Sequence, residues 1–180
     1  MTQKKTTDDK VDKIEKIQIL SFVLDQERFG VEISNIQEVL EYRSVTPVPR
    51  TPTYMLGVIN LRGQVVPVID LRSYFNMQLA APTVNSCIII VDVKIEGEET
   101  SIGLLADSVQ EVVELNVDDI SPPPKIGSRI RSEFIYGMVK HDEYFIILLR
   151  VSRIFSQEDL TDIQDVTVNV NNLATDESEL

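Results

Sequence analysis

The chain has no tryptophan, one cysteine, one histidine and no excess of basic residues. Cys87 cannot form a disulfide within the chain, and its place beside the apolar run 88–91 predicts a buried small hydrophobe. The formal net charge is −12 and no basic face is visible in the sequence, which disfavours a nucleic-acid partner. No apolar run approaches the ~20 residues that span a bilayer, and residues 1–16 lack the apolar core of a signal peptide. We therefore expect a soluble cytoplasmic protein without direct membrane insertion.

Residues for catalysis are scarce as well. His141 stands beside Asp142 and far in sequence from Cys87, so it predicts a lone surface histidine and neither a triad nor a metal site. No glycine-rich loop opens a helix, which disfavours a phosphate site. An enzyme built on small domains would need a nucleophile, a base and metal ligands together. We expect a non-catalytic protein with no cofactor and no metal.

The most informative segment that is present runs from Gly57 to Phe75. Its flanking runs, 58–61 and 65–69, are rich in β-branched residues, which favour strands. Arg62 and Gly63 between them predict a tight hairpin turn, because glycine accepts a positive φ. Arg62 is then either a solvated charge or a cation presented to a partner.

The segment before this hairpin predicts two strands and a helix. The strands are 17–24 and 29–33. Ser34 and Gln37 fit a capping box, and Ile36, Val39 and Leu40 follow at helical spacing, which predicts a helix over 34–41. Such an aliphatic face belongs either to the core or to a groove for an amphipathic helix.

The second half of the chain repeats this plan. Gly103 follows Gly30 by 73 positions, and Phe155 follows Phe75 by 80. The repeat predicts strands over 86–93 and 100–105, a helix over 108–114, and a hairpin whose tip carries Asp142 in place of an arginine. A repeat of 70–80 residues exceeds the ~20–50 residues of a solenoid unit, and short strands favour closure. The pattern therefore predicts two small β-barrels in tandem.

The expected domain organisation follows from the repeat. We expect a flexible tail over 1–16, one subdomain over about 17–80 and a second over about 81–155. Ser156 to Asp159 form another capping box, which predicts a C-terminal helix over 156–166. The polar, acidic segment 167–180 predicts a disordered tail.

The chain resembles the CheW family of chemotaxis coupling proteins over about residues 17–155. The resemblance rests on Gly-Val-Ile-Asn-Leu-Arg-Gly at 57–63 and Val-Pro-Val-Ile-Asp-Leu-Arg at 66–72. Supporting segments are Phe-Gly-Val-Glu-Ile at 29–33, Gln-Glu-Val at 37–39 and Gly-Leu-Leu-Ala-Asp-Ser-Val at 103–109.

The resemblance implies a mainly β fold of two tandem SH3-like five-stranded barrels with short helices and a C-terminal helix. It implies an adaptor that joins the regulatory domain of the histidine kinase CheA to the cytoplasmic tip of methyl-accepting chemotaxis receptors. Such a protein is cytoplasmic and is recruited to membrane-bound receptor arrays, its receptor docking between the barrels.

The implied binding residues fall into two groups. The receptor-binding positions are Ile36, Glu38, Val39 and Arg62. The implied kinase-binding positions are Ser121 and Ile126, where relatives often carry a basic and an aromatic residue.

Two non-enzymatic alternatives remain. The first is a coupling protein of a non-flagellar pathway that controls pili or gene expression, with the same fold and surfaces. The second is the regulatory end of a larger signalling protein. No phosphorylation-type aspartate cluster followed by a helix-rich segment supports the second alternative.

Overall fold

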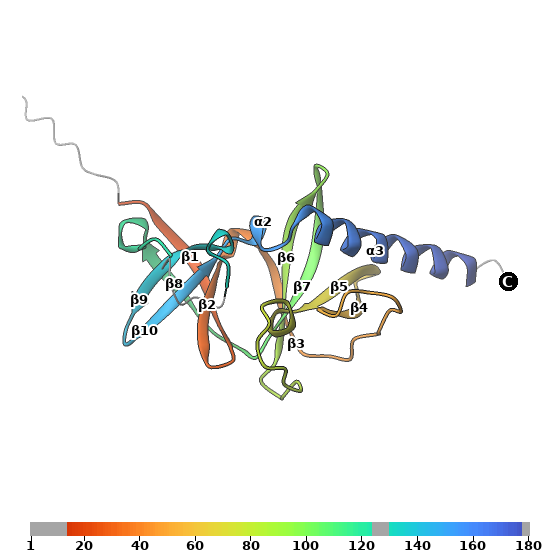
Figure 1. Cartoon of the computed structure of the whole chain (residues 1–180), viewed down its shortest axis with the longest axis horizontal. Coiled ribbons are helices and arrows are strands. Elements are labelled where there is room, and N and C mark those ends of the chain that lie inside the picture. The colour runs from red at the N-terminus through yellow and green to blue at the C-terminus, as the bar shows by residue number, and fades with distance from the viewer. Residues whose placement is uncertain (1–13, 124–129, 178–180) are drawn as a thin grey trace, which may run out of the picture.

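The computed structural model describes residues 14–123 and 130–177, in which ten strands form two five-stranded sheets (Figure 1). The strands are β1 (Lys16–Leu24), β2 (Glu27–Glu32), β3 (Ile36–Glu41), β4 (Met55–Leu61), β5 (Gln64–Asp70), β6 (Cys87–Ile95), β7 (Glu98–Ala106), β8 (Ser108–Asn116), β9 (Ile135–His141) and β10 (Tyr144–Leu149). The helices are the 3₁₀ turns η1 (Ile33–Asn35), η2 (Val117–Asp119) and η3 (Ser132–Phe134), the short α1 (Leu71–Tyr74) and α2 (Val151–Ile154), and the long α3 (Gln157–Glu177). The mainly β prediction is confirmed.

The two sheets exchange strands between the halves of the chain. Sheet A has the order β8-β1-β2-β10-β9, and sheet B has the order β3-β6-β7-β5-β4. The two orders are equivalent: if each strand in the order of sheet A is replaced by its repeat counterpart, five strands earlier or later in the chain, the order of sheet B results. Each sheet thus takes two strands from one half and three from the other. The expected division near residue 80 does not separate the sheets.

The exchange rests on one parallel strand pair in each sheet. In sheet A, β2 lies parallel to β10 with Gly30 opposite Leu148. In sheet B, β7 lies parallel to β5 with Gly103 opposite Val68. These two residue pairs are related by the same spacings of 73 and 80 positions that the sequence shows. The internal repeat is therefore structural.

Each sheet is curled so that its two edges meet at a seam. The stretch after β3 bridges β4 at Thr46 and Val58, whose backbone hydrogen bonds are both 2.9 Å. The stretch after β8 bridges β9 at Ser121 and Met138, with both bonds 2.8 Å. A single bridge joins the edges of each sheet within the described residues, so each barrel is closed at one point and not by a continuous ladder.

A glycine lies at each bridge because the crossing backbone leaves no room for a side chain. Gly57 has a φ of +145°, and a Cβ there would lie 2.0 Å from the carbonyl oxygen of Thr46. At the matching place in sheet A, a Cβ on Gly137 would lie 2.6 Å from the carbonyl oxygen of Ser121. Gly57 therefore belongs to the closure of the barrel.

The core consists of one cluster in each barrel and a larger cluster shared by both. Sheet A alone supplies one small cluster, which includes Ile19 and Leu148, and sheet B alone supplies the other, which includes Val68 and Ile88. The large cluster draws side chains from both sheets and from α3. Cys87, expected to be buried, is only half-buried at the start of β6. The shared cluster joins the two barrels into one body.

The two predicted helices in the repeat are wrong. Residues 36–41 form β3, which pairs with β6, and residues 108–116 form β8, which pairs with β1. Ser34 lies in η1, which has no side-chain cap bond. The β-branched residues that stood at helical spacing, among them Val39 and Val112, also suit a strand. Pairing with a strand from the other half of the chain made both segments strands and not helices.

The C-terminal helix begins as predicted and runs further. Asp159 accepts hydrogen bonds from the amide and hydroxyl of Ser156, at 3.1 and 2.8 Å, and its own amide donates to the Ser156 hydroxyl at 3.1 Å. Leu160, Ile163 and Val166 are buried against the large cluster. The helix continues to Glu177, so the disordered tail predicted from residue 167 is wrong over 167–177. Residues 178–180, and 1–13 of the predicted N-terminal tail, lie outside the described part.

Two tyrosines, Tyr54 just before β4 and Tyr74 at the end of α1, hold the first turn of α3 in place. Tyr54 and Tyr74 each donate a hydroxyl hydrogen bond of 2.9 Å to the Asp159 carboxylate, one to each oxygen. Burial and this hydrogen bond raise the pKa of both tyrosines. Burial alone would raise the pKa of Asp159, but the hydrogen bonds from Ser156 and the tyrosines outweigh it and lower that pKa below its ordinary value. The ionised carboxylate thus anchors the helix.

The anchor makes stability depend on pH in a defined direction. A carboxyl whose folded pKa is lowered stabilises the fold above its unfolded pKa of about 4, and this contribution is lost as pH falls through the folded value. Asp159→Asn should reduce the free energy of unfolding by about 1–2 kcal/mol at pH 7. The difference from the parent should shrink below about pH 4. Urea unfolding at several pH values measures it, with the exposed Glu158→Gln as control. A difference that stays constant down to pH 3 would contradict the anchor.

The seam glycine offers a second test. Gly57→Ala should lower the free energy of unfolding by about 2–4 kcal/mol, because the new methyl group meets the Thr46 carbonyl oxygen. Gly97 is the matched control: its φ of +83° is also positive, but a Cβ there meets nothing within 4 Å. Gly97→Ala should therefore cost only about 1 kcal/mol of backbone strain. Equal losses in urea unfolding would show that close approach at the seam is unimportant.

Candidate functional site

Two of the predicted receptor-binding residues, Glu38 and Arg62, meet across the seam of sheet B. Arg62 and Gly63 form the two-residue turn between β4 and β5, with φ values of +49° and +84° that are typical of a type I′ turn. The Arg62 guanidinium forms an ion pair with the Glu38 carboxylate through Nη2, and its Nη1 lies 3.4 Å from the other carboxylate oxygen. The sequence suggested a solvated or a presented cation, and the structure shows a paired one.

The pair remains open to a partner on the arginine side. The Arg62 side chain is 69% exposed, whereas the Glu38 side chain is 25% exposed. A second guanidinium lies nearby, because Arg43 donates a 3.0 Å hydrogen bond to the carbonyl oxygen of Asn60 in the same hairpin. Arg62 at the hairpin tip and Arg43 from the stretch after β3 thus bring two cations to this hairpin.

The other two predicted receptor residues do not join this pair. Ile36 is half-buried and packs against the large shared cluster. Val39 is 39% exposed and follows Glu38 directly in β3, so the two side chains leave opposite faces of the strand. Because β3 is an edge strand, both faces lie at the seam. The four predicted residues therefore surround one edge without forming a single flat patch.

Of the two predicted kinase-binding residues, Ser121 lies at the other seam. Ser121 is exposed, and its backbone forms the bridge to Met138 that closes sheet A. Ile126 lies outside the described residues. The kinase contact at these positions stays a prediction.

Sequence reasoning missed the role of Arg72, which joins the two sheets. It follows β5 in sheet B, and its Nε donates a 2.9 Å hydrogen bond to Asp107, which links β7 to β8. Its Nη2 makes a second contact with the same carboxylate, and Nη1 lies 3.7 Å from Asp25 in the β1–β2 turn of sheet A. The side chain is only 15% exposed. The signal was present in Asp-Leu-Arg at 70–72, but the two carboxylates that Arg72 contacts, Asp107 and Asp25, lie 35 or more positions away.

Further contacts hold the forked guanidinium group of Arg72, called here the Arg72 fork, in one orientation. The Arg72 side chain also donates a 2.7 Å hydrogen bond to the carbonyl oxygen of Gln78. Its hydrogen bond with Asp107 raises the pKa of Arg72, so the guanidinium stays charged. Asp70 caps α1 by accepting the Arg72 amide at 3.0 Å, and burial raises the pKa of that carboxyl. This junction fixes sheet B against the turn of sheet A.

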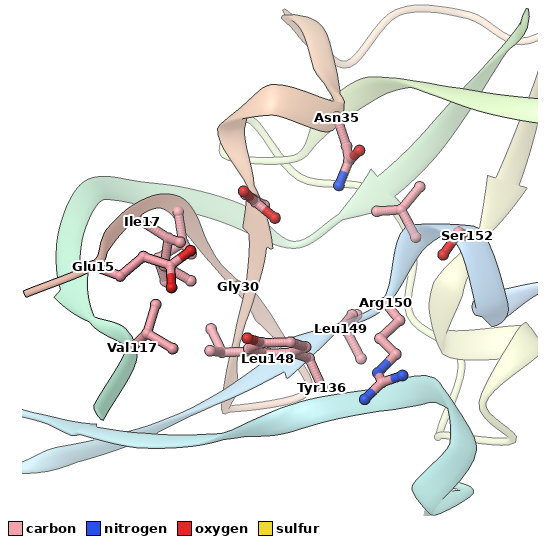
Figure 2. A pocket seen from close by; sticks show the side chains of 13 residues that line it. Glu15, Ile17, Gly30, Asn35, Val117, Tyr136, Leu148, Leu149, Arg150 and Ser152 are labelled. Carbon is pink, nitrogen blue, oxygen red and sulfur yellow. The ribbon is translucent and has the colours of Figure 1, made fainter. Parts of the chain in front are cut away.

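A cavity of about 440 Å³ opens on sheet A (Figure 2). Strands β1, β2 and β10 line it, with Tyr136 and Arg150 on one wall and Glu15 across from them. The Arg150 guanidinium lies 5.5 Å from the centre of the Tyr136 ring, and its buried Nε has no hydrogen-bond partner among the described residues. None of the predicted binding residues lines this cavity.

Comparison with known proteins identifies the family. The model of the CheW-like domain matches residues 18–159. The chain belongs to the CheW-like family. Two relatives are the chemotaxis protein CheW of Treponema pallidum, 27% identical over 81% of this chain and 86% of that one, and a probable chemotaxis protein CheW of Rhizobium etli, 34% identical over 78% and 88%.

A solved structure supports the same assignment. The scaffolding protein TtCheW from Thermoanaerobacter tengcongensis superposes with a TM-score of 0.72 and 34% identity, over 81% of this chain and 91% of that one. CheW-like proteins are non-catalytic scaffolds of chemotaxis, so the expectation that the chain is not an enzyme is confirmed. Among the helices of the described segments, none is long and apolar enough to cross a membrane.

The Arg72 junction of this CheW-like chain can be tested by a substitution that keeps the positive charge of residue 72 but removes the guanidinium. Arg72→Lys should lower the free energy of unfolding by about 2–3 kcal/mol, because one ammonium cannot replace the paired contacts to Asp107. Arg62→Lys, on the exposed pair, should change it by less than about 0.5 kcal/mol. Chemical denaturation of both variants measures the difference. A harmless Arg72→Lys would mean that packing alone holds the sheets together.

Proposed function

We propose that this chain is a non-catalytic adaptor that couples methyl-accepting chemotaxis receptors to the histidine kinase CheA. In this role it binds the regulatory domain of the kinase and the cytoplasmic tip of the receptor, in arrays at the membrane. Family membership supports the general role. The observation that carries the specific role is the open Glu38–Arg62 pair on an edge of sheet B.

The placement of the two predicted surfaces suits a coupling protein. Glu38, Val39 and Arg62 lie at the seam of sheet B, whereas Ser121 lies at the seam of sheet A. The shared core cluster and the Arg72 junction connect these sheets. A receptor and a kinase at the two seams would therefore occupy one rigid body without competing for the same residues.

Coupling in such an adaptor depends on differences in binding. A protein that contacts both partners transmits the state of one to the other only as far as its contacts differ between those states. Arg62 suits this role because its guanidinium can stay on Glu38 or turn to a carboxylate of a partner. If these two arrangements have similar energies, a small change in the partner can shift Arg62 from one to the other, so its contact differs between the partner's states.

Loss of the Arg62 guanidinium should weaken binding while the fold persists. Arg62→Ala should reduce affinity for the receptor tip by about 1–3 kcal/mol, or roughly 5- to 150-fold, since a partner carboxylate loses its charged donor. Arg62→Asn is the matched variant, because asparagine tolerates the positive φ of this turn better than alanine. Size exclusion and calorimetry with a receptor-tip fragment and with the CheA regulatory domain measure the effect.

A charge exchange separates contact from structure. In Glu38→Arg combined with Arg62→Glu, the ion pair is kept but its ends are reversed. If Arg62 touches the partner, the exchange does not restore binding; if the pair only supports the seam, it does. Unchanged binding of the Arg62→Asn variant to both partners would overturn the assignment, and a parent chain that binds neither partner would overturn the adaptor role.

A further inference from the structure

The single histidine of the chain is not isolated in the fold. His141 ends β9, and its Nε2 lies 3.2 Å from the Oε1 of Glu111 on β8 and 3.6 Å from the Oδ2 of Asp142 in the following turn. The strands β8 and β9 are the two edges of sheet A. The three side chains therefore assemble across the seam of that barrel, from residues 30 positions apart.

The internal repeat identifies the residues of sheet B that correspond to this cluster. Glu111 follows Glu38 by 73 positions, and Asp142 follows Arg62 by 80, which are the spacings that relate the two sheets. Where sheet B closes this part of its seam with a carboxylate and a guanidinium, sheet A has two carboxylates and an imidazole. The arginine that balances the charge in sheet B has no counterpart in sheet A.

The charge at the seam of sheet A is therefore open to a cation. Among the described residues, the ion pairs of Glu111 and Asp142 are both with His141. A neutral imidazole leaves two negative charges beside it. Carboxylate oxygens and an imidazole nitrogen are ligands that suit zinc and similar divalent transition metals.

Two of the three distances between ligand atoms fit such an ion. Zinc bonds to nitrogen and oxygen of about 2.0–2.2 Å at a tetrahedral angle place neighbouring ligand atoms about 3.3–3.6 Å apart. The two distances from His141 Nε2, 3.2 and 3.6 Å, lie close to this span, and all three ligand atoms lie within 4.8 Å of one another. We propose that Glu111, His141 and Asp142 bind a divalent transition metal, of the zinc class, that closes the seam of sheet A.

The ion would do in sheet A what Arg62 does in sheet B. It would connect the edge strands β8 and β9 on the hairpin side, beyond the backbone bridge between Ser121 and Met138. Three protein ligands leave a fourth position for water or for a ligand from a partner. The side chains are 31–75% exposed, so the site is reachable from solvent.

Zinc titration of the untagged full chain tests the proposal, since a histidine tag would add sites. Calorimetry should show one zinc ion per chain, and zinc at ten times its Kd should raise the unfolding midpoint by about 4 °C. Cobalt(II) should give the visible absorption of a four-coordinate nitrogen and oxygen site. His141→Gln and Glu111→Gln should each weaken zinc binding tenfold or more.

One variant rebuilds the chemistry of the other barrel. Asp142→Arg should replace the metal site by a glutamate–arginine pair, and Arg62 shows that arginine fits this turn, with a φ of +49° against +52° at Asp142. This variant should lose zinc binding and keep the midpoint of the metal-free parent. Cys87→Ser is the control for zinc held by the free thiol and should bind like the parent. Zinc binding that persists in His141→Gln or Glu111→Gln, disappears in Cys87→Ser, or needs millimolar zinc would overturn the site.

Discussion

The structure depends above all on two parallel strand pairs, β2 with β10 and β5 with β7. Each pair joins a strand of one half of the chain to a strand of the other, so neither half can complete a sheet alone. Parallel pairing also requires a long connection between its strands. Here β2 and β10 are connected through all five strands of sheet B, and β5 and β7 through α1 and β6. The shared core cluster follows from this exchange, because the faces of both sheets must meet where the chain crosses. The protein is therefore expected to unfold as one unit.

This constraint explains where the polar residues of the interior lie. At a crossing, a charged side chain can contact both sheets at once, and the Arg72 fork does so through Asp107 and Asp25. A charge of this kind is tolerated in a half-buried place only when several acceptors satisfy it. The same geometry limits how signals can pass, since one barrel cannot shift against the other without breaking this fork. Changes that an adaptor transmits are then more easily located at the seams, where single bridges hold the edges.

Much of the fold could be predicted from local patterns, and the errors have one physical origin. The hairpin turn at Arg62 and the capping box at Ser156 are set by neighbouring residues, and the repeat can be read from the sequence directly. The segments 36–41 and 108–116 fit a helix or a strand equally by spacing, and pairing partners from the other half made them strands. The continuation of α3 past residue 166 depended on a distant apolar surface, the large core cluster, against which Val170 packs. At the candidate site, the resemblance indicated Glu38 and Arg62, but their contact across the seam required the curl of sheet B.

The two seams have the same backbone arrangement but carry different side chains. The backbone needs at each seam only the bridge and its glycine, Gly57 or Gly137. The side chains next to the bridge take no part in the backbone bridge, so they can differ between the two seams. One seam accordingly carries the Glu38–Arg62 pair and the other the acidic cluster around His141. Because a fixed frame presents opposite charges at matching places, a partner can distinguish the two barrels although their strand orders are the same. Under the proposed function, this asymmetry would direct the two partners to different barrels.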